Sequence, residues 1–99
     1  MSDQPIAYVI GHITVKNPEK WDLYRSRVPA TLAPWGAELL LRGKLVSTLA
    51  GEHAHVDTVV IRFPSKEAVS NWHASSEYQA LIPLRNQAAE VVLISYESN

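Results

Sequence analysis

Six side chains in this 99-residue chain carry groups that could bind or convert a small organic molecule. Imidazole exchanges protons near neutral pH, and a guanidinium offers a planar set of donors to a carboxylate or an enolate. Aromatic side chains could stack on a planar ligand and orient it. The candidate catalytic residues are His12, Arg42 and Tyr78. The candidate substrate-binding residues are Tyr24, Trp72 and Arg85.

The three cationic candidates also have purely structural interpretations. His12 and Arg42 fall on the same predicted strand face, where a polar group is costly unless it is paired or hydrated. They could line a ligand pocket, or they could meet carboxylates or water at a subunit interface. Arg85 follows Pro83, and its charge could serve a cleft or a structural ion pair.

The aromatic candidates divide between core and cleft in the same way. Trp72 follows Ala68 by four residues on the apolar side of a predicted helix, a position typical of core aromatics. A buried Tyr78 would need a partner for its hydroxyl, and could direct that group into a cleft beneath the helices. Tyr24 lies on the apolar stripe of an earlier helix. His73, about 100° around the helix from Trp72, is expected to face solvent.

Several other chemistries are disfavoured by the sequence. The chain has no cysteine, which excludes disulfides and thiolate nucleophiles. His53 and His55 alternate in a predicted hairpin and could share a metal ion, but no convincing third ligand accompanies them. There is no GxSxG elbow, no P-loop and no dinucleotide-binding glycine pattern. The sequence therefore predicts no metal and no cofactor.

Composition limits the possible partners. Nine basic and ten acidic residues are scattered along the chain, and the formal net charge is -1. Such a balance favours neither nucleic acid nor an anionic membrane as a partner. The sequence shows no signal-peptide pattern and no apolar run long enough to span a bilayer. We therefore predict one cytoplasmic domain covering residues 1–99.

The first third of the chain predicts a strand followed by a helix. Residues 6–15 are rich in β-branched side chains, which is typical of a strand. Asn17 and Pro18 favour a helix start, and apolar residues at spacings of three or four continue toward Gly36. Pro29 interrupts this pattern, so two helical pieces or a kink are expected there.

The middle of the chain predicts a β-hairpin. Its strands are expected at residues 37–49 and 56–63, around a turn at 51–55. Simple alternation along the first of these strands places Leu39 and Leu41 on one face and Leu40, Arg42 and Lys44 on the other.

The remaining third predicts helix and then strand. Ser65 is positioned to cap a helix, and Ser75 with Ser76 indicates that the helix breaks and restarts. Residues 78–89 continue as helix with a kink at Pro83, and residues 91–96 form the last strand.

The order βαββαβ predicts the ferredoxin-like α+β fold, a four-stranded antiparallel sheet with both helices on one face. The opposite face also carries many apolar residues, which a sheet exposed to water would not. A monomer would then expose a larger apolar patch than soluble monomers usually tolerate. We therefore expect a homodimer that pairs sheet against sheet, a dimeric α+β barrel.

The chain resembles a known family through YVIGHITV, VPATLAPWG, LLRG, FPSKEAVSNWHASSEYQ and PLRNQAAE. These segments look like the small bacterial proteins described as domain of unknown function thirteen-thirty, and the resemblance implies a dimeric α+β barrel. It is looser to the antibiotic biosynthesis monooxygenases, which use no metal or flavin, and implies that Trp72 faces a substrate pocket. One departure is Arg62, where relatives often carry an acidic residue.

Two functions therefore stay open at the level of sequence. One is a cofactor-independent enzyme that acts on a small aromatic or enolisable metabolite held between sheet and helices. The other is a binding or accessory dimer without chemistry, favoured by the absence of a coherent catalytic triad or metal set. A cavity between sheet and helices would favour the first, and a fully packed interior would eliminate it.

Overall fold

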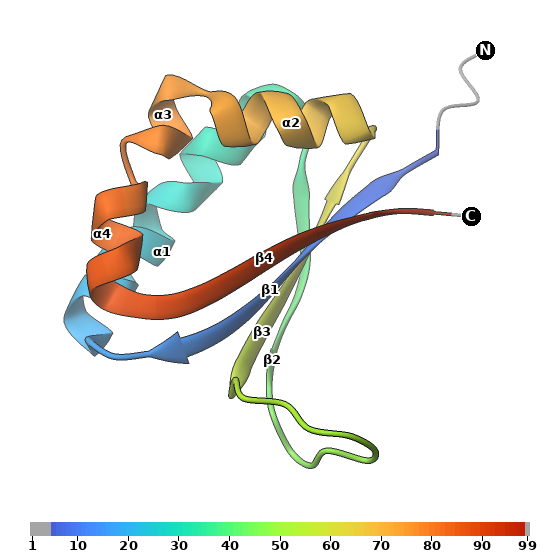
Figure 1. Ribbon diagram of the computed structural model, residues 1–99. Helices are drawn as coiled ribbons and strands as arrows, with labels where there is room; N and C mark the ends of the chain where they lie inside the picture. Colours follow the sequence, from blue (N-terminus) through green and yellow to red (C-terminus); the bar gives the residue numbers. More distant parts are fainter. Residues whose placement is uncertain (1–4, 99) are drawn as a thin grey trace.

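The computed structural model describes residues 5–98, which form one antiparallel sheet and a layer of helices (Figure 1). The elements are, in order, β1 (Ala7–Val15), α1 (Pro18–Leu32), η1 (Ala33–Trp35), β2 (Glu38–Lys44), β3 (Asp57–Phe63), α2 (Lys66–Ala74), α3 (Ser76–Gln79), α4 (Ile82–Ala88) and β4 (Ala89–Glu97).

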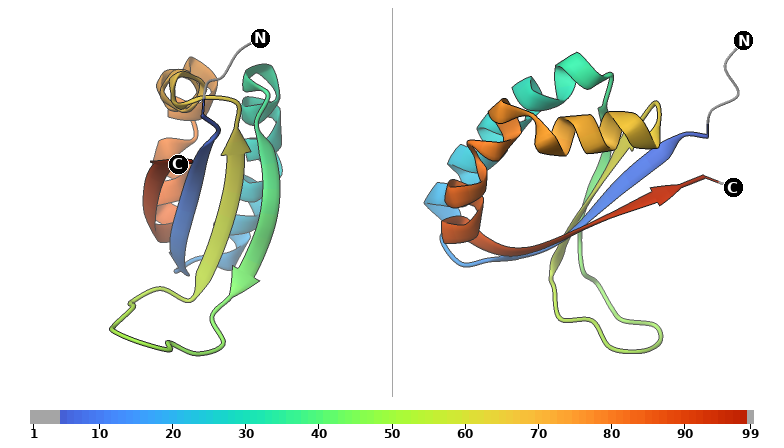
Figure 2. Two further views of the ribbon diagram at one scale, coloured as in Figure 1. Left: turned by 90° about the vertical axis from the view of Figure 1, so that its right-hand side faces the viewer. Right: turned by 45° about the horizontal axis from the view of Figure 1, so that its top comes forward.

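The four strands have the order β2-β3-β1-β4, and every neighbouring pair is antiparallel. Figure 2 shows all the helices on one side of the sheet, with the other side uncovered. This is the ferredoxin-like α+β arrangement, so the predicted fold class is confirmed. We call the side that packs on the helices the inner face, and the uncovered side the open face.

Local sequence signals account for the helix starts. The side chain of Asn17 accepts a hydrogen bond from the backbone N–H of Lys20, and Pro18 occupies the first turn. Ser65 caps α2 and Ser75 caps α3 in the same way. The break between α2 and α3 was thus readable from the repeated serines.

The prolines act differently from the sequence expectation. α1 continues through Pro29 to Leu32, so the first of the two expected alternatives, a split into two pieces, is wrong, and the second, a kink, stays a prediction. A proline in a helix removes one hydrogen bond, and here the surrounding bonds and the packing of α1 on the core maintain the helix. Pro83 lies in the first turn of α4, a position that proline tolerates, so the helix restarts there.

Strand β2 departs most from the sequence expectation. It ends at Lys44, and residues 45–56 form a long connection to β3 in place of a short turn. Leu39 pairs with Ile61 while Leu41 pairs with Val60, so the register shifts across Leu40. An extra residue of this kind is a β-bulge, and it reverses which side chains face inward beyond it.

The core lies between the inner face and the helices. Phe63 and Tyr78 are fully buried, and the Trp72 ring lies between them, with ring centroids 5.4 Å from Phe63 and 4.2 Å from Tyr78. The indole N–H of Trp72 donates to Thr31 Oγ1 at 3.0 Å. Trp72 therefore joins α2 to α1, β3 and α3, and is a core residue.

The open face carries a continuous aliphatic row. The register brings side chains from all four strands side by side, in the order Leu41, Val60, Ile10 and Ile94. Leu41 and Ile94 are exposed, and the other two are half-buried. Tyr8 and Tyr96 pair on one side of this row, with Tyr96 51% exposed. The apolar pattern predicted for this face is thus present.

Among the described residues, no helix combines the length and the hydropathy needed to cross a bilayer.

Replacing Trp72 with alanine should lower the free energy of unfolding by about 3 to 5 kcal/mol, because a buried indole and its hydrogen bond are lost. Urea denaturation at a fixed protein concentration measures this change. Asn71→Ala, at an exposed position of the same helix, should change it by less than about 0.5 kcal/mol. A cost for Trp72→Ala below about 1 kcal/mol would contradict the core assignment.

Candidate functional site

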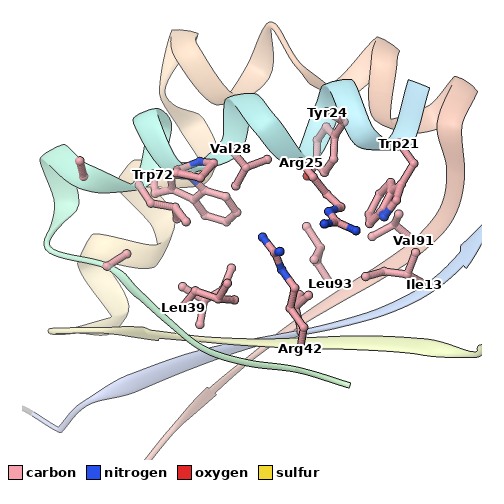
Figure 3. A pocket seen from close by; sticks show the side chains of 16 residues that line it. Ile13, Trp21, Tyr24, Arg25, Val28, Leu39, Arg42, Trp72, Val91 and Leu93 are labelled. Carbon is pink, nitrogen blue, oxygen red and sulfur yellow. The ribbon is translucent and has the colours of Figure 1, made fainter. Parts of the chain in front are cut away.

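A cavity of about 210 Å³ lies between α1 and the inner face of the sheet. Figure 3 shows its lining side chains pointing into the space between the helix and the strands. Sixteen residues line it, most of them apolar: Ile13, Trp21, Tyr24, Arg25, Val28, Pro29, Leu32, Ala33, Ala37, Leu39, Arg42, Val59, Ile61, Trp72, Val91 and Leu93. The interior of the protein is therefore not fully packed.

The sheet side of the cavity depends on Gly11. A Cβ atom at Gly11 would lie 3.0 Å from Val59 Cγ2 and 3.1 Å from Leu93 Cδ2, so these two side chains close over the space that Gly11 leaves. Both also line the cavity. A larger residue at this position would push them toward the helices and reduce the cavity.

Aromatic side chains form much of the helix side. Trp21 and Tyr24 stack with ring centroids 5.1 Å apart, and both are buried. Trp72, which belongs to the core, also lines the cavity near Val28 (Figure 3). Trp72 is thus a buried core residue that also borders the cavity.

Three of the sequence candidates meet in one hydrogen-bonded chain. The hydroxyls of Tyr24 and Tyr78 lie 2.8 Å apart, and Arg85 Nη1 donates to Tyr78 Oη at 3.0 Å. Tyr78 is completely buried, whereas Tyr24 lines the cavity. The partner that a buried Tyr78 requires is therefore supplied by α1 and α4 together.

Burial raises the pKa of the Tyr24 hydroxyl well above its ordinary value, and the neighbouring Tyr78 acts in the same direction. Tyr24 is therefore a neutral phenol at physiological pH and serves as a hydrogen-bonding group. Arg85 is held by Tyr78, and its side chain also contacts Asn86. Arg85 does not line the cavity, so its contact with any ligand would run through the two tyrosines.

Arg42 lines the cavity from the inner face of β2. Its placement corrects the expectation that Arg42 and His12 share a strand face. The bulge at Leu40 reverses the alternation, so that Leu39 and Arg42 both point toward the helices (Figure 3). A period of two applied through the bulge gives the wrong side for every residue after it.

A second cation at the cavity, Arg25 of α1, was missed by the sequence interpretation. A usable signal was present, because Arg25 follows Trp21 by four residues and precedes Val28 by three. This spacing places Arg25 at the edge of the apolar stripe. The sequence interpretation considered only the apolar members of this stripe and assigned no role to Arg25.

His12 lies on the open face, away from the cavity. Its Nδ1 atom is 3.2 Å from Thr58 Oγ1, and its ring is 4.9 Å from that of His53 between centroids. His55 lies beyond His53 and pairs with Thr14 through Nδ1 at 2.9 Å. Partial burial lowers the pKa of His12, and positive charge on His53 and His55 lowers it further. His12 therefore belongs to the open face and not with the other candidates.

No group of three or more potential ligands within residues 5–98 is arranged to hold a metal ion. The functional groups of the cavity lining are the guanidinium groups of Arg25 and Arg42 and the aromatic rings of Trp21, Tyr24 and Trp72. They can bind, orient and polarise an acidic or enolisable compound. The expected general acid or base, His12, is separated from them by the sheet.

The family model named "Domain of unknown function (DUF1330)" matches residues 6–98. The chain belongs to this family. The family resemblance stated from the sequence motifs is thereby confirmed. A comparison with curated proteins gave no match.

Solved structures with the same fold are similar in shape and distant in sequence. A protein of unknown function from Rhodopseudomonas palustris, RPA0582, has a TM-score of 0.82 at 13% identity, covering 97% of this chain and 84% of that one. SnoaB, a cofactor-independent oxygenase from Streptomyces nogalater, has a TM-score of 0.68 at 11% identity, with 96% and 94% covered.

A dimeric ferredoxin-like protein of unknown function from Thermobifida fusca has a TM-score of 0.68 at 10% identity, covering 99% of this chain and 95% of that one. At such identities the likeness shows the fold alone. The site must be argued from this chain's own residues.

Replacing Tyr78 with phenylalanine should lower the free energy of unfolding by about 1 to 3 kcal/mol, because Tyr24 and Arg85 both lose a buried partner. Thermal and urea denaturation measure the change. Tyr96→Phe removes a hydroxyl from a half-exposed ring and should cost less than about 0.5 kcal/mol. Equal effects of the two substitutions would show that the Tyr24–Tyr78–Arg85 chain contributes nothing to stability.

Proposed function

We propose that the protein is a homodimer that binds a small aromatic or enolisable metabolite in the cavity between α1 and the sheet. The single observation that carries this proposal is the apolar cavity itself, with cations and a phenol at its margin. We also propose that residues 1–99 form one domain and that the protein is cytoplasmic.

The size of the cavity supports a ligand with one ring. Apolar cavities of roughly 150 Å³ in protein interiors accept benzene. A cavity of about 210 Å³ therefore has room for a single aromatic ring with a short polar arm. Trp21, Tyr24 and Trp72 offer ring surfaces for stacking.

The chemistry that this site supports is polarisation of a carbonyl or enolate. Arg25 and Arg42 are donors at the cavity, and the neutral ring of Tyr24 also lines it. Such donors stabilise negative charge on an enolate oxygen without a metal or a cofactor. Binding alone, without turnover, is the second candidate, because the residues at the cavity include no histidine or carboxylate to act as a base.

The open face supports the homodimer. Its aliphatic row crosses all four strands, and the exposed members of this face include Leu41, Val92 and Tyr96. Contiguous apolar patches on monomers rarely exceed a few hundred Å². A second copy placed sheet against sheet covers the row on both chains with one two-fold contact, and the two copies then enclose a barrel.

Replacing Val28 with tryptophan should fill the cavity and abolish the binding of single-ring aromatic probes. Indole and phenylacetate, followed by ligand-observed NMR and by thermal shift, serve as the probes. Val46→Trp, in the connection where Val46 is 97% exposed, should leave binding unchanged. A wild-type protein that binds neither probe, or a Val28→Trp protein that binds as well as wild type, would contradict a ligand cavity here.

An assay of hydrogen exchange at the carbon next to a ketone distinguishes an enzyme that forms an enolate from a protein that only binds the ligand. If the protein accelerates deuterium uptake into phenylpyruvate, and Arg42→Gln slows it, the enzyme is supported. Binding without exchange would favour the accessory dimer.

Replacing Ile10 with aspartate should convert a dimer into a monomer, because the charge lies at the centre of the aliphatic row. Sedimentation at micromolar concentration should give twice 11.0 kDa for the wild type and about 11.0 kDa for the variant. Val46→Asp, on the exposed connection, should remain dimeric, and circular dichroism checks that each variant is folded. An 11.0 kDa wild-type particle would exclude the dimer.

A further inference from the structure

We propose that the cavity selects organic acids: Arg25 and Arg42 together hold the carboxylate of the ligand, and the apolar lining takes its ring. This inference rests on the proposed function, and it narrows the ligand from aromatic or enolisable compounds to carboxylate anions. It also assigns a binding role to Arg25, a residue without a role in the interpretation of the sequence.

The two arginines approach the same point from opposite layers. Arg25 belongs to α1 and Arg42 to β2, and both line the cavity as well as the neighbouring hollow of about 250 Å³. Figure 3 shows their guanidinium ends turned toward each other in the space between helix and sheet. They therefore form the boundary between the apolar cavity and the more polar hollow.

No carboxylate in the cavity lining balances the positive charges of Arg25 and Arg42. The sixteen lining residues include two guanidinium groups and no carboxylate. Asp22 and Asp57 line the neighbouring hollow together with both arginines, and neither belongs to the cavity lining. Two like charges that face each other repel, and an anion placed between them removes that repulsion and gains charge-assisted hydrogen bonds. The arrangement thus favours an acidic group directed outward from a buried ring.

The bulge in β2 directs the Arg42 side chain into the cavity. In a regular strand Arg42 would lie on the open face, and Gly43 would take its place toward the helices. The extra residue at Leu40 reverses this, and bulges of this kind often re-aim a side chain. A local irregularity in pairing therefore serves to place one cation opposite another.

The lining decides which anion fits. A phosphate carries about two charges and needs donors on several sides, whereas this site offers two forks at one end of an apolar space. A carboxylate has two coplanar oxygens, which a guanidinium matches with paired hydrogen bonds. With room for one ring, the ligand class is an arylcarboxylate or a similar small hydrophobic acid.

A matched pair of probes tests the charge. Phenylacetate and phenylacetamide have the same ring and nearly the same shape, and differ in charge. Titration calorimetry of the wild type should show the acid binding at least about tenfold more tightly than the amide, and this preference should shrink as salt is added.

Matched variants test the residues. Arg25→Gln and Arg42→Gln should each weaken phenylacetate about tenfold and leave phenylacetamide unchanged. Arg27→Gln makes the same change of charge on α1 at an exposed position outside the lining, and should alter neither affinity by more than about twofold. Thermal melting without ligand checks that all three variants are folded.

The outcomes separate this inference from the proposed function. Equal binding of the two probes, or equal effects of Arg27→Gln and the two lining substitutions, would overturn the organic-acid inference while leaving a ligand cavity in place. Binding of neither probe, with the protein folded, would overturn both. If only Arg42→Gln lost binding of the acid, the proposed role of Arg25 in holding the carboxylate would be contradicted.

Discussion

A sheet that is apolar on both faces is the constraint on which the rest of this structure depends. The helices cover the inner face, and no described element covers the aliphatic row on the open face. A ferredoxin-like chain supplies helices for one face only. The architecture of this chain therefore joins a covered face, where a ligand is proposed to bind, to an uncovered one, where a second copy is proposed to pack.

The two polar systems of the inner layer differ in how completely they are satisfied. Tyr24, Tyr78 and Arg85 satisfy one another across α1, α3 and α4, and such closed networks fix the packing of the elements that carry them. Arg25 and Arg42 instead line the cavity from opposite layers, with their guanidinium ends turned toward each other. The first system holds the helices in position, and the second is the proposed contact to a ligand.

The similar structures show that this fold hosts more than one kind of protein, among them a cofactor-independent oxygenase and proteins without assigned function. Fold therefore does not decide chemistry. The candidate site of this chain depends on particular positions: the gap above Gly11 that Val59 and Leu93 close, and the register shift at Leu40.

The order of strands and helices was predictable from the sequence because it depends on local signals. The caps at Asn17, Ser65 and Ser75 and the alternation along β1 act over a few residues, and the structure follows them. His12 could be placed on the open face for the same reason. The expected split of the helix at Pro29 was wrong, since tertiary packing outweighed a local preference.

The candidate site was decided by tertiary structure. Tyr24 and Tyr78 are separated by 54 positions in sequence, and only the packing of α1 on α3 brings their hydroxyls together. The side of β2 on which Arg42 lies depends on how β2 pairs with β3. The bulge falls within three consecutive leucines, so the sequence does not show which of them is unpaired. Residue types were thus set by sequence, whereas the meeting of two arginines required the pairing of strands and the packing of a helix upon them.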